Sequence, residues 1–192
     1  MSAMSDLRSA TWTQHQLLEK RLDIKSRFTE LGAYRAHLEK MWGFCAPLEQ
    51  WLGRCFHGGA LPDYDRRRKV PLLTRDLIAL GAKSGSVPSL PCCRTQPDGD
   101  DPAAAFGCCY VLEGATLGGR TLLPLVQSRM GLSAERGAAF LASYGEDVAV
   151  MWRGFGEALE AWCHVPDRRM RARQAAVDTF ASLDRWLCGK SS

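Results

Sequence analysis

Apolar and polar residues follow the period of an α-helix along most of this chain. One face of a first helix carries Leu7, Thr11, Leu18 and Leu22, spaced four or seven residues apart. We expect Ser5 or Asp6 to cap this helix, because short polar side chains accept hydrogen bonds from the first free amides. No run of alternating β-branched residues indicates a sheet. The pattern therefore predicts an all-α fold.

Further helices are predicted from the same periodicity at 26–56, 70–81, 102–128, 133–145, 146–162 and 167–189. We expect Pro47 to bend the first of these helices and Ser133 to cap the fourth. The segment 83–102 is rich in Pro, Gly, Ser and Asp, and is predicted to be irregular. With 192 residues and no internal repeat, the chain is expected to form one domain, 1–192, built as a multi-helix bundle.

Composition and charge exclude several classes of protein. The 25 Lys and Arg residues exceed the 21 Asp and Glu residues by only four, too few for a nucleic-acid-binding surface. No apolar run approaches the roughly 20 residues of a membrane span. The first residues lack the basic and apolar regions of a secretion signal, so we expect a cytoplasmic protein. A mildly basic surface suits an anionic ligand or an acidic partner.

The eight cysteines do not form a recognisable metal or disulfide pattern. None is part of a Cys-x-x-Cys pair, and no histidine spacing of zinc-finger type accompanies them. We therefore expect free thiols, with Cys108 and Cys109 buried as small apolar residues at the start of a helix.

Several enzyme signatures are absent from the sequence. There is no Gly-x-Ser-x-Gly elbow and no His-Glu-x-x-His pair, and "GATLGGR" lacks the lysine of a phosphate-binding loop. The basic runs 66–69 and 168–173 have no interleaved aromatic residues, so we expect them to form solvated faces.

Three glycines, Gly114, Gly118 and Gly119, interrupt the predicted helix 102–128. Each interior glycine costs about 0.5–1 kcal/mol relative to alanine, so their presence needs a reason. Gly114 and Gly118 are four residues apart and lie on one helical face. A face without side chains admits either a second helix or a flat ligand close to the backbone.

His15 is the histidine with the strongest chemical context. It lies on the apolar stripe of the first helix, with Glu19 one turn later. A neutral imidazole oriented by a carboxylate can bind a metal, although a structural role is also compatible with this pattern. Arg8 lies two turns before His15, a rise of about 10 Å, and could meet an anion at the rim of a ligand. An inward histidine and a bare helix face together predict a slot for a metalloporphyrin.

Two motifs resemble those of a known family. "LRSATWTQHQLLE" and "YVLEGATLGGR" are similar to the proximal-helix and distal-helix motifs of the α-helical haem oxygenases, most closely the bacterial members found with bacteriophytochromes. The resemblance spans nearly the whole chain. It implies that His15 binds the haem iron with Glu19 as its partner, and that Arg8 and Arg153 contact the propionates. It also implies backbone contacts to the distal side of the haem from Gly114 and Gly118, beside Ala115 and Gly119.

The resemblance also implies a reaction. Haem would be both cofactor and substrate, cleaved with O2 at a meso carbon, expected to be the α-meso carbon, to give biliverdin, carbon monoxide and free iron. The electrons would come from a ferredoxin or a flavoprotein reductase, and a bacteriophytochrome is a candidate acceptor of biliverdin. A haem carrier or sensor and a helical interaction module without ligand stay open as alternatives.

Ala115 departs from the family pattern, in which relatives carry aspartate or serine at this position. The departure puts in doubt how protons reach the distal side of the haem, rather than whether haem binds. We expect Thr116 or backbone carbonyls to hold the water molecules that a carboxylate would otherwise anchor.

Overall fold

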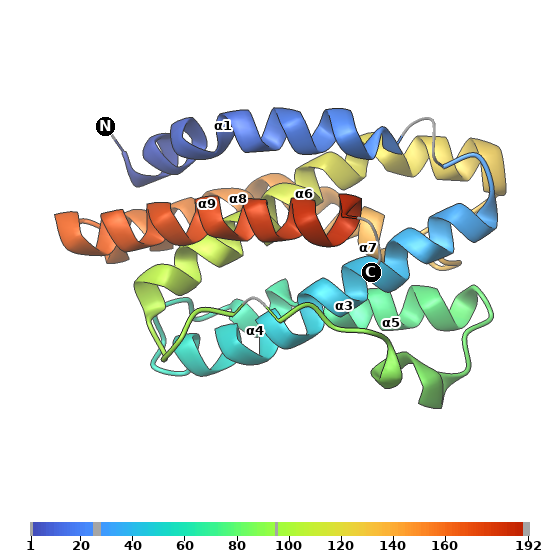
Figure 1. The fold of residues 1–192 in the computed structure, drawn as a ribbon, viewed down its shortest axis with the longest axis horizontal. Coiled ribbons are helices and arrows are strands. Elements are labelled where there is room, and N and C mark those ends of the chain that lie inside the picture. Colours follow the sequence, from blue (N-terminus) through green and yellow to red (C-terminus); the bar gives the residue numbers. More distant parts are fainter. Residues whose placement is uncertain (1, 25–27, 95, 190–192) are drawn as a thin grey trace.

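The computed structural model describes residues 2–24, 28–94 and 96–189, which form helices joined by loops (Figure 1). The longer helices are α1 (Ala3–Leu22), α3 (Leu31–Phe56), α5 (Val70–Ala79), α6 (Pro102–Met130), α8 (Val148–Trp162) and α9 (Pro166–Cys188). Shorter helical segments are α4 (Tyr64–Arg67), η1 (Ser84–Ser89), α7 (Ala139–Ala142) and η2 (Gly145–Asp147). The described residues contain isolated β-bridges but no strand, so the all-α prediction is confirmed.

The helices pack into one bundle in which α9 lies between α1 and α6. In Figure 1, α1 runs along the upper edge of the molecule, and α9 lies beneath it and packs against both α1 and α6. Gly107 permits the close approach of α6 to α9, because a Cβ atom at this position would overlap the carbonyl of Ala172. The pair α3 and α5 completes the lower part of the bundle.

Pro47 lies inside α3, and the carbonyl that it leaves without a partner in the helix accepts a hydrogen bond from another segment. A proline has no N–H, so the carbonyl four residues earlier, that of Gly43, loses its partner within the helix. The amide of Cys93 donates to this carbonyl instead, at 2.9 Å. Gly43 also has no side chain that would collide with Pro91. The irregular segment after η1 is thereby fastened along α3.

The start of α1 differs from the sequence prediction. Ser2, rather than Ser5 or Asp6, caps the helix, and its hydroxyl accepts a hydrogen bond from the amide of Ser5 at 3.1 Å. The carboxylate of Glu160 on α8 accepts from the next free amides, those of Ala3 at 2.9 Å and Met4 at 3.0 Å. The helix begins earlier because a distant residue satisfies its amides. The predicted start of the second helix at Ser26 lies outside the described residues, and α3 begins at Leu31.

The predicted helix 133–145 is wrong. Ser133 pairs with Arg136 in a turn, and Gly137 has a φ of 83°, which interrupts helical geometry. Only α7 forms, and its first amides are satisfied from another element: Asp76 on α5 accepts from Ala139 at 2.8 Å and from Phe140 at 2.7 Å. The local sequence could not reveal this long-range cap.

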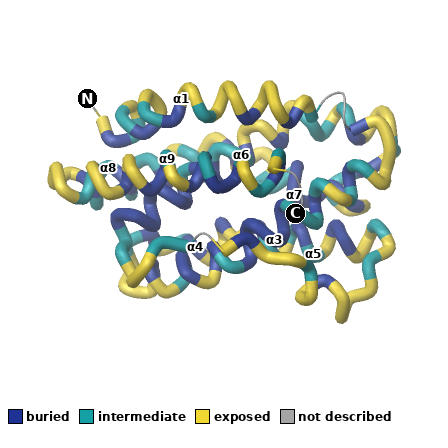
Figure 2. Tube along the Cα trace, in the orientation of Figure 1, coloured by how far each residue is buried: buried dark blue, intermediate teal, exposed yellow. Residues whose placement is uncertain are grey.

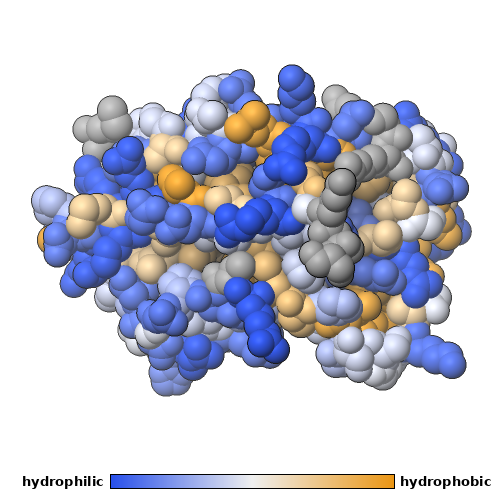
Figure 3. Space-filling view, viewed as in Figure 1, coloured by the Kyte–Doolittle hydropathy of each residue, from blue (hydrophilic) through white to orange (hydrophobic). Residues whose placement is uncertain are grey.

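Burial follows the helix faces (Figure 2). The core contains large side chains such as Trp51, Phe44 and Phe106, which are at most 2% exposed. Cys108 and Cys109 are buried free thiols, as predicted. On the face drawn in Figure 3, hydrophilic residues predominate and apolar residues form smaller patches. Among the described residues, no helix is both long and apolar enough to cross a membrane.

Candidate active site

A cleft opens between α1 and α6, and its floor is α9. It consists of two adjoining cavities of about 670 Å³ and 420 Å³. Both cavities are lined by His15, Glu19, Gly114, Gly118 and Phe180. Cavities of this size accommodate a single organic ligand. The structure thus brings the predicted histidine and the predicted glycines to the same cleft, with Gly114 and Gly118 lining both cavities.

The glycines of α6 have different surroundings. A Cβ atom added to Gly114 or Gly118 would meet no atom within 4 Å, because both positions face open space in the cleft. At Gly119, by contrast, a Cβ would lie 2.8 Å from the carbonyl oxygen of Leu141. Helix packing therefore explains Gly119 and Gly107, whereas Gly114 and Gly118 leave room for a ligand. Gly119 and Ala115 line the smaller cavity.

His15 is held between two aromatic rings. Phe180 on α9 meets its imidazole edge-on at 5.8 Å between centroids, and Trp12 stacks roughly parallel to it at 6.5 Å. The side chain of His15 is 46% exposed, more than expected for an apolar stripe, because it faces the cleft. Glu19 lies 3.8 Å from Nε2 of His15, near enough to orient the ring but too far for a hydrogen bond.

The two ends of the cleft differ in chemistry. The larger cavity contains Arg8, the only cation that lines either cavity among the described residues, together with Tyr110 and Trp152. Burial raises the pKa of the Tyr110 hydroxyl, although its hydrogen bond with Thr11 and the charge of Arg8 oppose the shift. The smaller cavity is mainly apolar, with walls that include Leu18, Met41, Val111, Leu122, Phe140, Leu141, Leu183 and Leu187. A ligand with one anionic end and one apolar end matches this asymmetry.

Arg153 does not line the cleft. It lies on the exposed side of α8, whereas Trp152 beside it faces the larger cavity. The structure therefore brings Arg8 to the cleft but leaves Arg153 outside its walls.

The part of α6 that faces the cleft offers few proton donors. Thr116 is buried outside the cleft lining, and its hydroxyl donates to the carbonyl of Glu113 at 2.5 Å, so the expectation that it holds water in the cleft is wrong. Thr121 lines the smaller cavity, and its hydroxyl donates to the carbonyl of Gly118 at 2.8 Å. Ala115 contributes only a methyl group.

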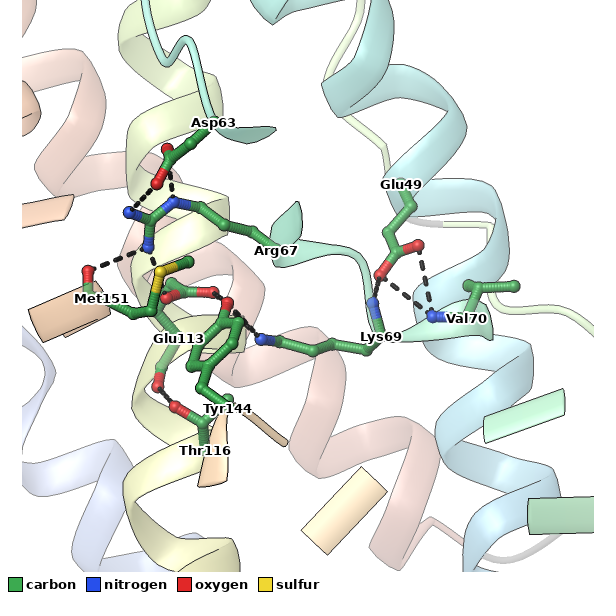
Figure 4. A network of polar contacts seen from close by, with 9 residues as sticks. All are labelled: Glu49, Asp63, Arg67, Lys69, Val70, Glu113, Thr116, Tyr144 and Met151. Carbon is green, nitrogen blue, oxygen red and sulfur yellow. Dashed lines mark hydrogen bonds and ion pairs between the residues drawn. The ribbon is translucent and has the colours of Figure 1, made fainter. Parts of the chain in front are cut away.

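A buried ionic cluster adjoins the glycine stretch and was missed by sequence reasoning. Arg67 and Lys69 are only 3% and 1% exposed, so the expectation that the run 66–69 forms a solvated face is wrong for these two residues. Their side chains reach Glu113, which directly precedes Gly114 (Figure 4). The available signal was a lone glutamate within an apolar stretch of helix.

Known proteins resemble this chain in sequence. A family model described as "Heme oxygenase" matches residues 1–188. A protein named "Heme oxygenase" from Xanthomonas campestris pv. campestris (strain 8004) is 30% identical over 151 residues, which cover 77% of each chain.

Two solved structures share the fold. The NO- and CO-bound haem oxygenase from Neisseria meningitidis has a TM-score of 0.77 at 23% identity, over 100% of this chain and 94% of that one. The haem oxygenase from Leptospira interrogans has a TM-score of 0.80 at 18% identity, over 98% and 99%. At these identities, the likeness concerns the fold.

Proposed function

Because this chain belongs to the haem oxygenase family and is a haem oxygenase, we propose that its substrate haem binds in the cleft between α1 and α6. His15 would bind the iron from one side, and the backbone at Gly114 and Gly118 would cover the other. The observation that carries this proposal is the pair of glycines whose missing side chains face the cleft opposite an imidazole.

The residues that line the cleft fit a bound haem. The larger cavity supplies one imidazole, that of His15, and the smaller cavity adds that of His37. A single imidazole such as that of His15 suits an iron that brings its own equatorial ligands. Arg8 supplies a cation for propionates at one end, and the apolar walls of the smaller cavity suit the hydrocarbon edge of a porphyrin. Arg153 is proposed as a second propionate contact on the resemblance alone.

Each residue has a distinct task in this proposal. Bound haem supplies the iron and the porphyrin that react with O2 and external electrons to give biliverdin, carbon monoxide and free iron. Glu19, 3.8 Å from the imidazole of His15, would help to orient that ring. Gly114 and Gly118 leave space for a diatomic gas, while Ala115 and Gly119 form the wall beside them. The backbone position of α6 thus controls which edge of the porphyrin is accessible, and we propose the α-meso carbon as the site of cleavage.

Proton supply is expected to come from water held in the cleft. The hydroxyls of Thr116 and Thr121 both donate to main-chain carbonyls, and Ala115 carries no titratable group. Backbone carbonyls of α6 are therefore the proposed anchors for that water.

The chain needs external partners for turnover. We propose a ferredoxin or a flavoprotein reductase as electron donor, because the net charge of +4 favours an acidic protein. A bacteriophytochrome is the proposed acceptor of biliverdin, on the resemblance alone.

A haem carrier or sensor is the second candidate function, because Ala115 removes the distal side chain that supports proton transfer. Incubation of the haem complex with ascorbate in air separates the two functions. Loss of the Soret band with new broad red absorption supports the oxygenase, whereas an unchanged Soret band supports the carrier. Absence of any haem complex would indicate an interaction module.

His15→Ala tests the ligation directly. We expect the variant to lose turnover and most of the ferric Soret absorption of the complex. Biliverdin production at the wild-type rate in this variant would refute the assignment of His15.

A further inference from the structure

A buried ionic cluster fastens α6 to three other elements at the point where the glycine stretch begins (Figure 4). Glu113 is 1% exposed, and its carboxylate accepts hydrogen bonds from Arg67 in α4 at 2.8 Å and from Lys69, which precedes α5, at 3.1 Å. Tyr144, which precedes η2, donates its hydroxyl to the same carboxylate at 2.6 Å. None of these side chains lines the cleft.

The cluster extends beyond α6 and is closely balanced in charge. Arg67 also donates to the carbonyl of Met151 in α8 at 3.0 Å and forms an ion pair with Asp63 at 2.7 Å. Lys69 donates to the Tyr144 hydroxyl at 2.7 Å and lies 4.1 Å from the centre of its ring. Two buried cations thus face two carboxylates, and each oxygen of Glu113 has at least one donor.

Burying such a cluster is a poor way to gain stability. Desolvation of buried charges offsets much of their attraction, and well-packed apolar residues often serve the fold equally well. What the ion pairs provide is a defined geometry, because hydrogen bonds to a carboxylate are directional and removal of any partner leaves a charge uncompensated. The cluster therefore fixes the position of Glu113 relative to α4, α5 and α8.

The glycine stretch has little with which to pack on its cleft side, because only the side chains of Ala115 and Leu117 within 114–118 line a cavity. Gly114 and Gly118 face open space, so no side chain at these two positions sets the separation of α6 from His15. Contacts elsewhere on α6 must determine it. Glu113 is one peptide bond from Gly114 and supplies such a contact at the start of the stretch, while Gly119 packs against Leu141 at its end.

The backbone around Tyr144 supports a geometric role. Ser143 has φ 45° and ψ −112°, and Tyr144 has φ −82° and ψ 3°, which are the central conformations of a type II′ turn. The first of these positions favours glycine, so a serine there is strained. The Ser143 hydroxyl is also buried without a hydrogen-bond partner among the described residues. The chain tolerates both defects at the position that directs Tyr144 toward Glu113.

We propose that Glu113 is a positioning residue: its buried ion pairs fix the stretch 114–118 of α6 opposite His15. This inference rests on the proposed binding of haem in the cleft. Without the anchor, the stretch would sample a wider range of positions over the bound haem.

The first test uses the protein without haem. Glu113→Gln keeps the shape of the side chain but removes its charge, so we expect faster amide hydrogen exchange at 114–119 than in the wild type. Glu49→Gln is the matched control, because Glu49 is equally buried at 3% exposure but accepts from the amides of Lys69 and Val70 at the start of α5. Equal exchange at 114–119 in Glu113→Gln and the wild type would overturn the proposal.

The second test uses the haem complex and separates positioning from stability. The double variant Glu113→Leu with Lys69→Met removes both charges, and we expect it to unfold at nearly the wild-type urea midpoint. It should nevertheless release haem about tenfold faster and broaden the C–O stretching band of the ferrous carbonyl complex. Tyr144→Phe, which loses one hydrogen bond, should show the same changes to a smaller extent and covers the case in which the double variant does not fold.

The outcomes distinguish the two proposals. A stable variant at Glu113 that keeps the wild-type C–O stretching band and the wild-type rate of haem release would overturn the positioning role. That result would leave the proposed binding of haem unaffected. Failure of the wild type to bind haem would overturn the proposed function, and the exchange experiment would still report whether Glu113 restrains α6.

Discussion

The ring of Phe180 on α9 stands edge-on to the imidazole of His15 on α1, with an angle of 83° between the two planes. The packing of α1 on α9 thereby supports the proposed iron ligand from beside the cleft. Edge-to-face aromatic pairs contribute about 0.5–1.5 kcal/mol beyond simple burial, enough to bias the rotamer of a half-exposed side chain.

Phe180→Leu is expected to weaken haem binding roughly tenfold, because the imidazole loses the ring edge that orients it. The loss of stability should be modest, about 1 kcal/mol, since leucine still fills most of the space. Haem titration and urea denaturation measure the two effects. Phe44→Leu, at a buried position in α3 that does not line the cleft, is the control and should leave haem affinity unchanged. Similar haem affinities in both variants would contradict the orienting role.

Gly118→Leu should block ligand binding without harming the fold. The new side chain would enter the open space of the cleft, and leucine is a better helix former than glycine by up to about 1 kcal/mol. We expect a folded protein of at least wild-type stability whose haem affinity falls by tenfold or more, on the order of 1.4 kcal/mol. A haem affinity equal to that of the wild type would contradict the assignment of Gly118 to the site.

Gly119→Ala should have the opposite profile. Its Cβ would lie 2.8 Å from the carbonyl oxygen of Leu141, so α6 and α7 would have to separate. We expect a loss of about 1–3 kcal/mol in the free energy of unfolding, measured by urea denaturation. A variant as stable as the wild type would show that the two helices are not in close contact.

Ser143→Gly should stabilise the protein by about 1 kcal/mol, because glycine adopts a φ of 45° without strain and removes a buried hydroxyl that has no partner in the described structure. The midpoint of thermal unfolding should rise by about 2–4 °C. Ser143→Ala keeps the strained conformation and should gain less. A lower midpoint of thermal unfolding in Ser143→Gly than in the wild type would contradict the strained turn at Ser143.

Glu160→Ala should destabilise the protein in a pH-dependent manner. Burial disfavours the charge of Glu160, but hydrogen bonds from the amides of Met4 and Ala3 outweigh this effect and hold the pKa of the carboxyl below its ordinary value of 4.5. A lowered carboxyl pKa contributes stability above the unfolded pKa, and this contribution disappears as the pH falls through the folded pKa. We expect a loss of about 1 kcal/mol at pH 7, as for other helix caps, and a smaller loss below pH 4.5.

Urea denaturation at the two pH values measures this difference. Glu157→Ala, at an exposed position on the same helix, is the control and should show no comparable loss. A pH-independent loss in Glu160→Ala would argue against the carboxylate as the source of the stabilisation.

The sequence was most informative where structure is local. The helical period located α1, α3, α6, α8 and α9, because each of these helices buries a continuous apolar face. Because His15 and the glycines are far apart in the sequence, helical periodicity could not show that they are close in space. The two motifs were nevertheless specific enough to predict the two walls of one cleft. Physical reasoning alone could not decide between helix packing and ligand space for the glycines, and the structure divides them between the two explanations.

The sequence was least informative where one element completes another from far away. Asp76 caps α7 from 63 residues earlier, and the carboxylate of Glu160 accepts hydrogen bonds from the first amides of α1, which lie 157 and 156 residues earlier. Likewise, the burial of Arg67 depends on Glu113, 46 residues further along. Local patterns contain no information about such partners, so short polar or charged segments were assigned to solvent or to the wrong element.

The placement of the cysteines has a chemical consequence for an enzyme whose reaction releases iron in the presence of oxygen. Burial raises the pKa of Cys55 and Cys163 to about 11 and that of Cys108 to about 12, so their thiols stay protonated near neutrality. Since oxidants attack the thiolate, these sulfur atoms are protected from conversion to sulfenic acid. Exposed Cys92 is then the position at which oxidative self-damage should begin.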